Sequence, residues 1–237
     1  MTGTTSTPRP PRIRRDLARL GPVQQLRAGR LGRRLPQLFV GLVLYGVTLA
    51  MVIRATLGNA PWDVLHQGLA RHLPISIGTA VIVVSLLVLL LWIPLRELPG
   101  LGTIANSFLI GLSADAALGV LPAPDALWLR AAFTVGGVLL NAIATAMYIG
   151  SQFGPGPRDG LMTGLHRRTG LPIGVVRTAL EVVVVALGWL LGGVLGIGTV
   201  LYAVAIGPLV QVFLPLFIVD LPEGRTGASL PPEQRRV

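Results

Sequence analysis

Hydrophobic residues occur along this chain in six long runs, separated by short polar or glycine- and proline-rich breaks. The runs cover residues 36–55, 75–95, 101–121, 129–149, 175–195 and 197–219. Each is long enough to cross the roughly 30 Å hydrocarbon core of a bilayer as a helix that rises about 1.5 Å per residue. The last break is the weakest, because residues 182–219 carry no charge and only a few glycines separate the two runs. The pattern predicts an all-α membrane bundle of six transmembrane helices.

Composition supports this class of protein. The chain is 52% hydrophobic and 13% charged, with a mean hydropathy of +0.70, whereas soluble domains carry about 25% charged residues. It has no cysteine, which excludes disulfides, thiolate metal sites and a cysteine nucleophile. His66, His72 and His166 lack the partners that a zinc site needs, and we expect all three at the surface. Because no catalytic constellation is recognisable, the sequence favours a protein that is not an enzyme and uses no metal or cofactor.

The positive charge indicates orientation and not nucleic-acid binding. All 20 basic residues are arginines, and nine of them precede the first hydrophobic run, which is a flanking segment and not a basic face on a folded domain. If the N-terminus is cytoplasmic, 17 arginines lie inside and only Arg54, Arg71 and Arg130 lie outside. Positive residues are concentrated on the cytoplasmic side of membrane proteins. We therefore predict that both termini are cytoplasmic.

The two ends of the chain are expected to lie outside the helix bundle. Residues 1–34 are predicted to form a disordered basic arm. Alternatively, Ile13, Leu17 and Leu20 form the apolar face of a short helix on anionic lipid headgroups. Residues 221–237 are predicted to form a disordered tail. Between the two ends lie a first three-helix unit at residues 35–130 and a second at residues 131–220.

An internal repeat with an offset of 96 residues connects the two units. The matching pairs include Gly41 and Gly137, Gly58 and Gly154, Pro61 and Pro157, Asp63 and Asp159, Gly68 and Gly164, Arg71 and Arg167, and Thr103 and Thr199. Matches of Pro, Asp, Arg and Thr in one register indicate a duplication. Because each unit holds three spans, the second enters the membrane from the opposite side, which predicts two inverted repeats of the kind found in many secondary transporters. The alternative is a duplication that only builds a stable bundle.

Each repeat contains the motif Gly-x-x-Pro-x-Asp-x-Leu-x-x-Gly-Leu, at residues 58–69 and 154–165. Proline followed two residues later by aspartate is typical of a helix start. We therefore expect a short helix after the first span of each repeat, the two on opposite sides of the membrane and either interfacial or re-entrant. An apolar stripe of Trp62, Leu65 and Leu69 in one copy, and of Leu161 and Leu165 in the other, suits such a helix. For Asp63 and Asp159, helix capping and a direct role in gating or binding both stay open.

Polar side chains inside the spans are the candidate binding residues. Asp115 lies in the third span, where an unpaired carboxylate is costly, and Gln211 matches it in the sixth. Arg177 and Glu181 are four residues apart, so they form either a neutral ion pair or a cation or proton site tuned by the arginine. These four residues form the predicted substrate or ion site, although Asp115 can also serve as a hydrogen bond between helices. Asn141 in the fourth span is expected to make an interhelical hydrogen bond.

The sequence around the first motif resembles a known family. Gly-Asn-Ala-Pro-Trp-Asp-Val-Leu-His-Gln-Gly-Leu at 58–69, Pro-Ile-Ser-Ile-Gly at 74–78 and Leu-Gly-Thr-Ile-Ala-Asn at 101–106 resemble the YczE family of bacterial integral membrane proteins, and more loosely the YitT family. The resemblance covers about residues 36–220. It implies a bacterial cytoplasmic-membrane protein of about five to six spans, with transport or permeation as the suggested activity. It supplies no catalytic or binding residues.

Two classes of function fit these features. The first is a small-solute transporter or permease that works by alternating access of inverted repeats. The second is a non-transporting scaffold or accessory protein that binds a partner or a lipid. The expected partners are the bilayer, anionic headgroups near the arm and, for a carrier, an unidentified small solute. In a carrier Asp115 and Glu181 should line a wet cavity, and in a scaffold they should be sealed in helix contacts.

Overall fold

The computed structural model describes residues 21–221, and these residues are entirely helical apart from turns and loops. In chain order the helices are α1 (Pro22–Arg27), α2 (Leu31–Ala55), α3 (Pro61–His72), α4 (Ile77–Leu95), α5 (Leu101–Val120), α6 (Leu127–Gly150), α7 (Pro157–Thr169), α8 (Ile173–Leu190) and α9 (Ile197–Phe217). Six of them, α2, α4, α5, α6, α8 and α9, are long and apolar enough to span a membrane. The predicted all-α architecture is confirmed, and the six predicted spans correspond to these six candidate membrane-spanning helices.

The helix bounds differ from the predicted ones mainly at the ends. Helix α8 ends at Leu190, earlier than expected, because the chain turns through Gly192 with a φ of 78°. Residues 21–34, which the sequence assigned to the disordered arm, instead form α1 and the first turn of α2. The rest of the predicted arm and nearly all of the predicted tail, at residues 1–20 and 222–237, lie outside the described residues.

Both predicted short helices are present, as α3 and α7. Pro61 and Pro157 occupy the first position of their helices, where a missing backbone N–H costs nothing. The motif glycines explain how the chain enters them: Gly58 has a φ of 115° and Gly154 a φ of 104°. Only glycine adopts such left-handed backbone without strain. The motif therefore encodes a sharp turn from a long helix into a short one.

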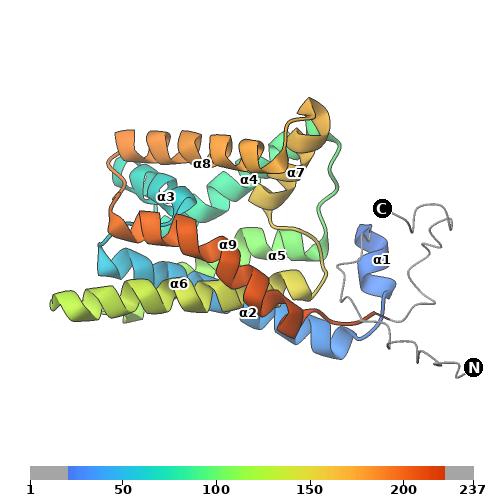
Figure 1. The fold of residues 1–237 in the computed structure, drawn as a ribbon, viewed down its shortest axis with the longest axis horizontal. Coiled ribbons are helices and arrows are strands. Elements are labelled where there is room, and N and C mark those ends of the chain that lie inside the picture. Colours follow the sequence, from blue (N-terminus) through green and yellow to red (C-terminus); the bar gives the residue numbers. More distant parts are fainter. Residues whose placement is uncertain (1–20, 222–237) are drawn as a thin grey trace, which may run out of the picture.

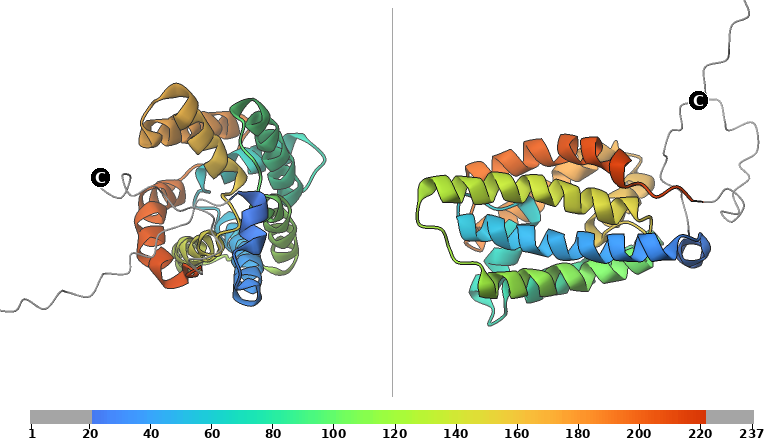
Figure 2. Two further views of the ribbon diagram at one scale, coloured as in Figure 1. Left: turned by 90° about the vertical axis from the view of Figure 1, so that its right-hand side faces the viewer. Right: turned by 90° about the horizontal axis from the view of Figure 1, so that it is seen from below.

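The helices form two layers. Helices α9, α6, α2 and α5 lie side by side in one layer, as the right-hand view of Figure 2 shows. Helices α8, α3, α4 and α7 pack against one another in the second layer, in the upper half of Figure 1. At one edge α4 packs closely on α5, whereas no comparable contact joins α8 to α9 within the described residues. In Figure 1, α8 and α9 are joined at the left and diverge to the right.

The two halves of the chain repeat the same sequence of elements. Helices α2, α3, α4 and α5 begin at residues 31, 61, 77 and 101, and α6, α7, α8 and α9 begin at residues 127, 157, 173 and 197. Each helix in the second half thus starts 96 residues after its counterpart, the offset of the sequence repeat. The packing of the two halves is equivalent as well. Helix α2 packs on α5 as α6 packs on α9, and α3 packs on α8 as α7 packs on α4.

Individual contacts between the halves are reciprocal. Arg34 near the start of α2 donates from Nε to the carbonyl oxygen of Ser151 at 2.8 Å. Its counterpart Arg130, near the start of α6, donates from Nε to the carbonyl oxygen of Ala55 at 2.8 Å. Residues 55 and 151 are again 96 apart. Each arginine therefore satisfies carbonyl groups that the other long helix leaves free at its C-terminus.

The backbone shows the same exchange at a second place. The amide of Gly102 donates to the carbonyl oxygen of Phe153 at 2.8 Å, and the amide of Gly198 donates to the carbonyl oxygen of Leu57 at 2.9 Å. The two donors, Gly102 and Gly198, are 96 residues apart, and so are the two acceptors, Leu57 and Phe153. The reciprocity thus includes the starts of α5 and α9.

Trp92 holds α7 against α4. Its side chain is 2% exposed, and its indole N–H donates to the carbonyl oxygen of Pro157 at 3.0 Å. A Cβ atom at Gly160 would overlap the Trp92 ring, so the glycine permits the close approach. Of the two predicted apolar stripes, Leu161 belongs to the buried hydrophobic cluster around Trp92, and the other four residues pack against this cluster.

We expect Trp92→Phe to lower the free energy of unfolding by about 1–2 kcal/mol, because it leaves the buried Pro157 carbonyl without its donor. Thermal unfolding of the purified protein in detergent measures the effect. Trp189→Phe is the matched control, because Trp189 is 59% exposed and should contribute little. Equal effects of the two substitutions would contradict the role given to the indole hydrogen bond.

Candidate binding cavity

A cavity of about 260 Å³ lies between the layers where α8 and α9 diverge. Helices α6, α7, α8 and α9 and the first turn of α3 all contribute to its lining. Its polar residues are Thr145, Tyr148, Arg158, Asp159, Arg177, Glu181, Tyr202 and Gln211. So many polar side chains within an apolar bundle mark this cavity as the candidate functional site.

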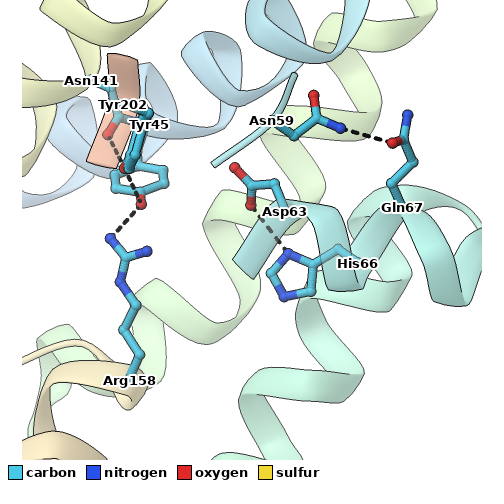
Figure 3. A network of polar contacts seen from close by, with 8 residues as sticks. All are labelled: Tyr45, Asn59, Asp63, His66, Gln67, Asn141, Arg158 and Tyr202. Atoms are coloured by element: carbon cyan, nitrogen blue, oxygen red, sulfur yellow. Dashed lines mark hydrogen bonds and ion pairs between the residues drawn. The ribbon is translucent and has the colours of Figure 1, made fainter. Parts of the chain in front are cut away.

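A chain of hydrogen bonds adjoins the cavity, and two of its members, Arg158 and Tyr202, line it (Figure 3). Arg158 donates from Nη2 to the hydroxyl of Tyr45 at 2.6 Å. The hydroxyl oxygens of Tyr45 and Tyr202 are 3.5 Å apart, and Tyr202 donates to Oδ1 of Asn141 at 2.9 Å. Asn141 donates in turn to the Thr48 hydroxyl at 2.8 Å, which is the interhelical hydrogen bond expected for this residue. The network thus connects α2, α6, α7 and α9.

A second cavity of about 50 Å³ lies beyond this network. Trp62, Tyr148 and Arg158 line both cavities, so these three side chains separate them. Asp63 and His66 line only the second cavity, and Asp63 Oδ1 lies 3.2 Å from His66 Nδ1. Tyr148 donates to Oδ2 of Asp159 at 2.7 Å on the side of the first cavity. The two motif aspartates therefore face different cavities.

Neither motif aspartate caps its own helix through a side-chain hydrogen bond. Both lie in the first helical turn, where a carboxylate interacts favourably with the helix dipole. The structure therefore shows no hydrogen-bonded helix cap by either residue. Instead, the Asp63 carboxylate lines the second cavity and the Asp159 carboxylate lines the first.

The histidine prediction is wrong for His66, which is only 6% exposed. The first half of α3 is buried in the bundle, and residue 66 lies one helical turn after Asp63 on that buried side. His72, at the end of α3, is exposed, and His166 is half-buried. Within residues 21–221 no group of three or more His, Asp or Glu side chains is placed to hold a metal ion.

The structure brings together three of the four predicted site residues. Arg177, Glu181 and Gln211 all line the larger cavity. Arg177 Nε donates to Glu181 Oε1 at 2.9 Å, so the predicted ion pair forms. Asp115 does not line this cavity. It belongs to α5, and its side chain contacts the start of α4, where Oδ1 accepts the backbone N–H of Gly78 at 2.8 Å and Oδ2 accepts the Ser76 hydroxyl. Asp115 thus caps a neighbouring helix.

The contact made by Asp115 exists in only one half of the protein. Gly78 and Gly111 allow α4 and α5 to touch, because a Cβ atom at either residue would overlap the carbonyl oxygen of the other. The residues 96 positions later are Gly174, Gly207 and Gln211. Gly174 and Gly207 face open space, and Gln211 lines the cavity. Equivalent helix pairs are therefore closed at α4–α5 and open at α8–α9.

Sequence reasoning missed the residues at the centre of the site, namely Arg158, Tyr45, Tyr148, Tyr202 and Thr145. One usable signal was present at the repeat offset, where Tyr45 matches Asn141 and Asn106 matches Tyr202. Each pair exchanges a tyrosine for an asparagine, and all four residues line a cavity or join the central network. Arg158 was assigned only to the cytoplasmic face, because its helix was not known to begin inside the bundle.

Comparison with known proteins places these features in a family. A family of unknown function, DUF6198, matches residues 32–215, which include all six long helices almost completely. The chain belongs to this family. It is 43% identical to an uncharacterized protein of Haemophilus influenzae, over 78% of the chain and 84% of the relative. It is 32% identical to the uncharacterized membrane protein YczE of Bacillus subtilis, over 75% and 83% of the two chains.

A third relative, the uncharacterized protein YyaS of Bacillus subtilis, is 26% identical over 75% of this chain and 90% of its own length. No solved structure shows significant similarity to the chain. The resemblance to YczE is thus confirmed at the level of family. Together with the six apolar helices, it supports a location in a membrane.

Proposed function

We propose that this DUF6198 protein is a small-solute carrier that works by alternating access of two inverted repeats in the bacterial cytoplasmic membrane. The first repeat comprises α2–α5 and the second α6–α9. Helices α3 and α7 act as re-entrant elements whose first turns meet near the centre of the bundle. The larger cavity is the substrate site, open to one side of the membrane.

The reciprocal contacts of Arg34 and Arg130 support the inverted arrangement. They join the start of α2 to the end of α6 and the start of α6 to the end of α2, so these two helices are antiparallel. An operation that exchanges two antiparallel helices is a two-fold rotation about an axis perpendicular to both. When both helices cross the membrane, that axis lies in the membrane plane, which is the symmetry of inverted-repeat transporters.

The observation that carries the proposal is the difference between the two equivalent helix pairs. Because the two repeats have nearly the same fold, two states are available: one in which α4 packs on α5, and one in which α8 packs on α9. Here Asp115 and the two glycines close the first pair, and the second stands open beside the cavity. Exchange of the two arrangements closes the cavity on one side and enlarges the second cavity on the other. This exchange is alternating access.

The orientation follows from the arginines. The cavity is lined by residues near the start of α8 and in the middle and second half of α9, and in Figure 1 these two helices diverge toward the end of the bundle where α2 begins. With both chain termini in the cytoplasm, as 17 of 20 arginines favour, the cavity is open to the cytoplasm. Anionic headgroups of that leaflet then face the basic arm.

Cysteine accessibility tests this proposal, because the chain has no cysteine of its own. Thr145 lines the larger cavity, and its counterpart 96 residues earlier, Leu49, lines the small one. In a working carrier Thr145→Cys should react with a membrane-impermeant maleimide added from the cytoplasmic side, and Leu49→Cys from the outer side. Inside-out and right-side-out vesicles distinguish the two sides, and labelling after denaturation in SDS controls for the amount of each variant.

A scaffold would give a different pattern. The position of Asp115 in the contact between α5 and the start of α4 favours that second function, because a carboxylate that caps a helix need not bind a solute. A rigid scaffold leaves Leu49→Cys unreactive from the outer side at every time point. That outcome, or reaction of both cysteines from the same side, rules out alternating access.

A further inference from the structure

Charges of both signs line the larger cavity, and their formal sum is zero. Arg158 and Arg177 are the cations, and Asp159 and Glu181 are the anions. Arg177 and Glu181 satisfy each other through their ion pair. The charges available to a ligand are therefore those of Arg158 and Asp159, adjacent in the first turn of α7.

Arg158 has no acidic partner within ion-pair distance in the described part of the chain. It donates a hydrogen bond from Nη2 to the neutral hydroxyl of Tyr45, and its guanidinium carbon lies 5.6 Å from the centre of the Tyr45 ring. A guanidinium group has five N–H donors and suits a carboxylate, which it binds through two parallel hydrogen bonds. Asp159 uses Oδ2 for the Tyr148 hydroxyl, and its Oδ1 is left for a donor from a ligand.

Thr145 provides an independent observation. Its side chain lines the cavity and is 7% exposed, and its buried hydroxyl has no hydrogen-bond partner. A buried hydroxyl without a partner costs about 1–3 kcal/mol, so such groups in proteins generally have one. A ligand in the cavity would supply the missing partner. The aliphatic side chains of Leu180, Ile206 and Val210 also line the cavity and offer an apolar surface beside these polar groups.

We propose that the cavity binds a small zwitterion of the α-amino acid type, whose carboxylate contacts Arg158 and whose ammonium group contacts Asp159. The Thr145 hydroxyl bonds one of the two charged groups, and an aliphatic side chain of the ligand packs on Leu180, Ile206 and Val210. This inference rests on the proposed carrier function and names its substrate class. A dipole matches a cavity of zero formal charge, whereas a simple anion or cation would leave one protein charge uncompensated in a medium of low dielectric constant.

Thermal unfolding of the purified protein with chosen probes tests this assignment, because a ligand that binds the folded state raises the unfolding temperature. Glycine, L-alanine and L-leucine are the zwitterionic probes. Two analogues of leucine are the matched controls: 4-methylpentanoate lacks the ammonium group, and isoamylamine lacks the carboxylate. We expect saturable stabilisation by L-leucine and none by either analogue.

Variants at the two charges identify the site. Arg158→Gln and Asp159→Asn should each weaken binding of L-leucine by about 10–100-fold, because each removes a charge-assisted hydrogen bond of about 1.5–3 kcal/mol. Arg158→Lys, which keeps the charge and loses the planar fork, should weaken it less than Arg158→Gln. Arg168→Gln, at the exposed end of the same helix, should bind like the wild type. The unfolding temperature of each variant without ligand shows whether it folds.

The possible outcomes separate the two proposals. Stabilisation by 4-methylpentanoate or isoamylamine equal to that by L-leucine would make the cavity an anion or a cation site and overturn the zwitterion assignment. The assignment also fails if none of the three amino acids stabilises the protein, or if Arg168→Gln weakens binding as much as Arg158→Gln. In each case the cysteine accessibility of residues 49 and 145 still decides, independently, whether the protein alternates between two open states.

Discussion

Replacement of Arg34 by leucine is expected to lower the free energy of unfolding by about 3–5 kcal/mol, the largest loss of stability we expect from any single substitution. The Arg34 side chain is fully buried and lies with its guanidinium carbon 4.2 Å from the centre of the Phe153 ring. It donates to the carbonyl oxygens of Gln25, Gly29, Ser151 and Gln152. Leucine would fill part of the space and leave these carbonyl groups in an apolar environment without the donor.

Unfolding by heat or by SDS, followed in detergent by tryptophan fluorescence, measures the loss. Arg33→Leu is the matched control, because Arg33 is adjacent in sequence and exposed, and it should change stability only slightly. The counterpart substitution Arg130→Leu should have an intermediate effect, since Arg130 binds equivalent carbonyl groups at a more exposed position. If Arg33→Leu and Arg34→Leu prove equally harmful, Arg34 acts only as one more positive charge at the end of the helix.

Arg34 also shows what the sequence could not reveal. In sequence it is one of nine arginines before the first hydrophobic run, and nothing local distinguishes it from Arg33. Its role depends on the end of α6, more than 100 residues away, which the fold places beside it. The repeat offset pairs Arg34 with Arg130, but a pairing of residues does not reveal a contact. The spans, by contrast, were predictable because hydrophobic length alone determines them.

The candidate site was predictable in part, for similar reasons. The pairing of Arg177 with Glu181 follows from helix geometry, since residues four apart share a face. The position of Asp115 does not, because its partner is the N-terminus of another helix that approaches only through Gly78. Arg158 was also hidden, because sequence places a basic residue beside the cytoplasm, whereas the short helix α7 begins inside the bundle.

The same substitution at two equivalent glycines is expected to move the carrier in opposite directions. Gly78→Val places a side chain against the Gly111 carbonyl and the Asp115 carboxylate, so it should force α4 away from α5. Gly174→Val meets open space in the present state and should obstruct only the closure of α8 on α9. Overpacking costs typically 1–3 kcal/mol, which is enough to change the ratio of two states by about 5–150-fold.

Labelling of the two cavity cysteines measures this shift. With Gly78→Val, Leu49→Cys should react faster from the outer side and Thr145→Cys more slowly from the cytoplasmic side. With Gly174→Val the opposite is expected, and solute flux should fall in both variants because each blocks one half of the cycle. Gly119→Val, at a helical glycine whose Cβ would also meet open space but which lies outside both helix contacts, controls for the added bulk. If Gly78→Val and Gly174→Val shift the two labelling rates in the same direction, the two helix pairs are not alternating gates of one carrier.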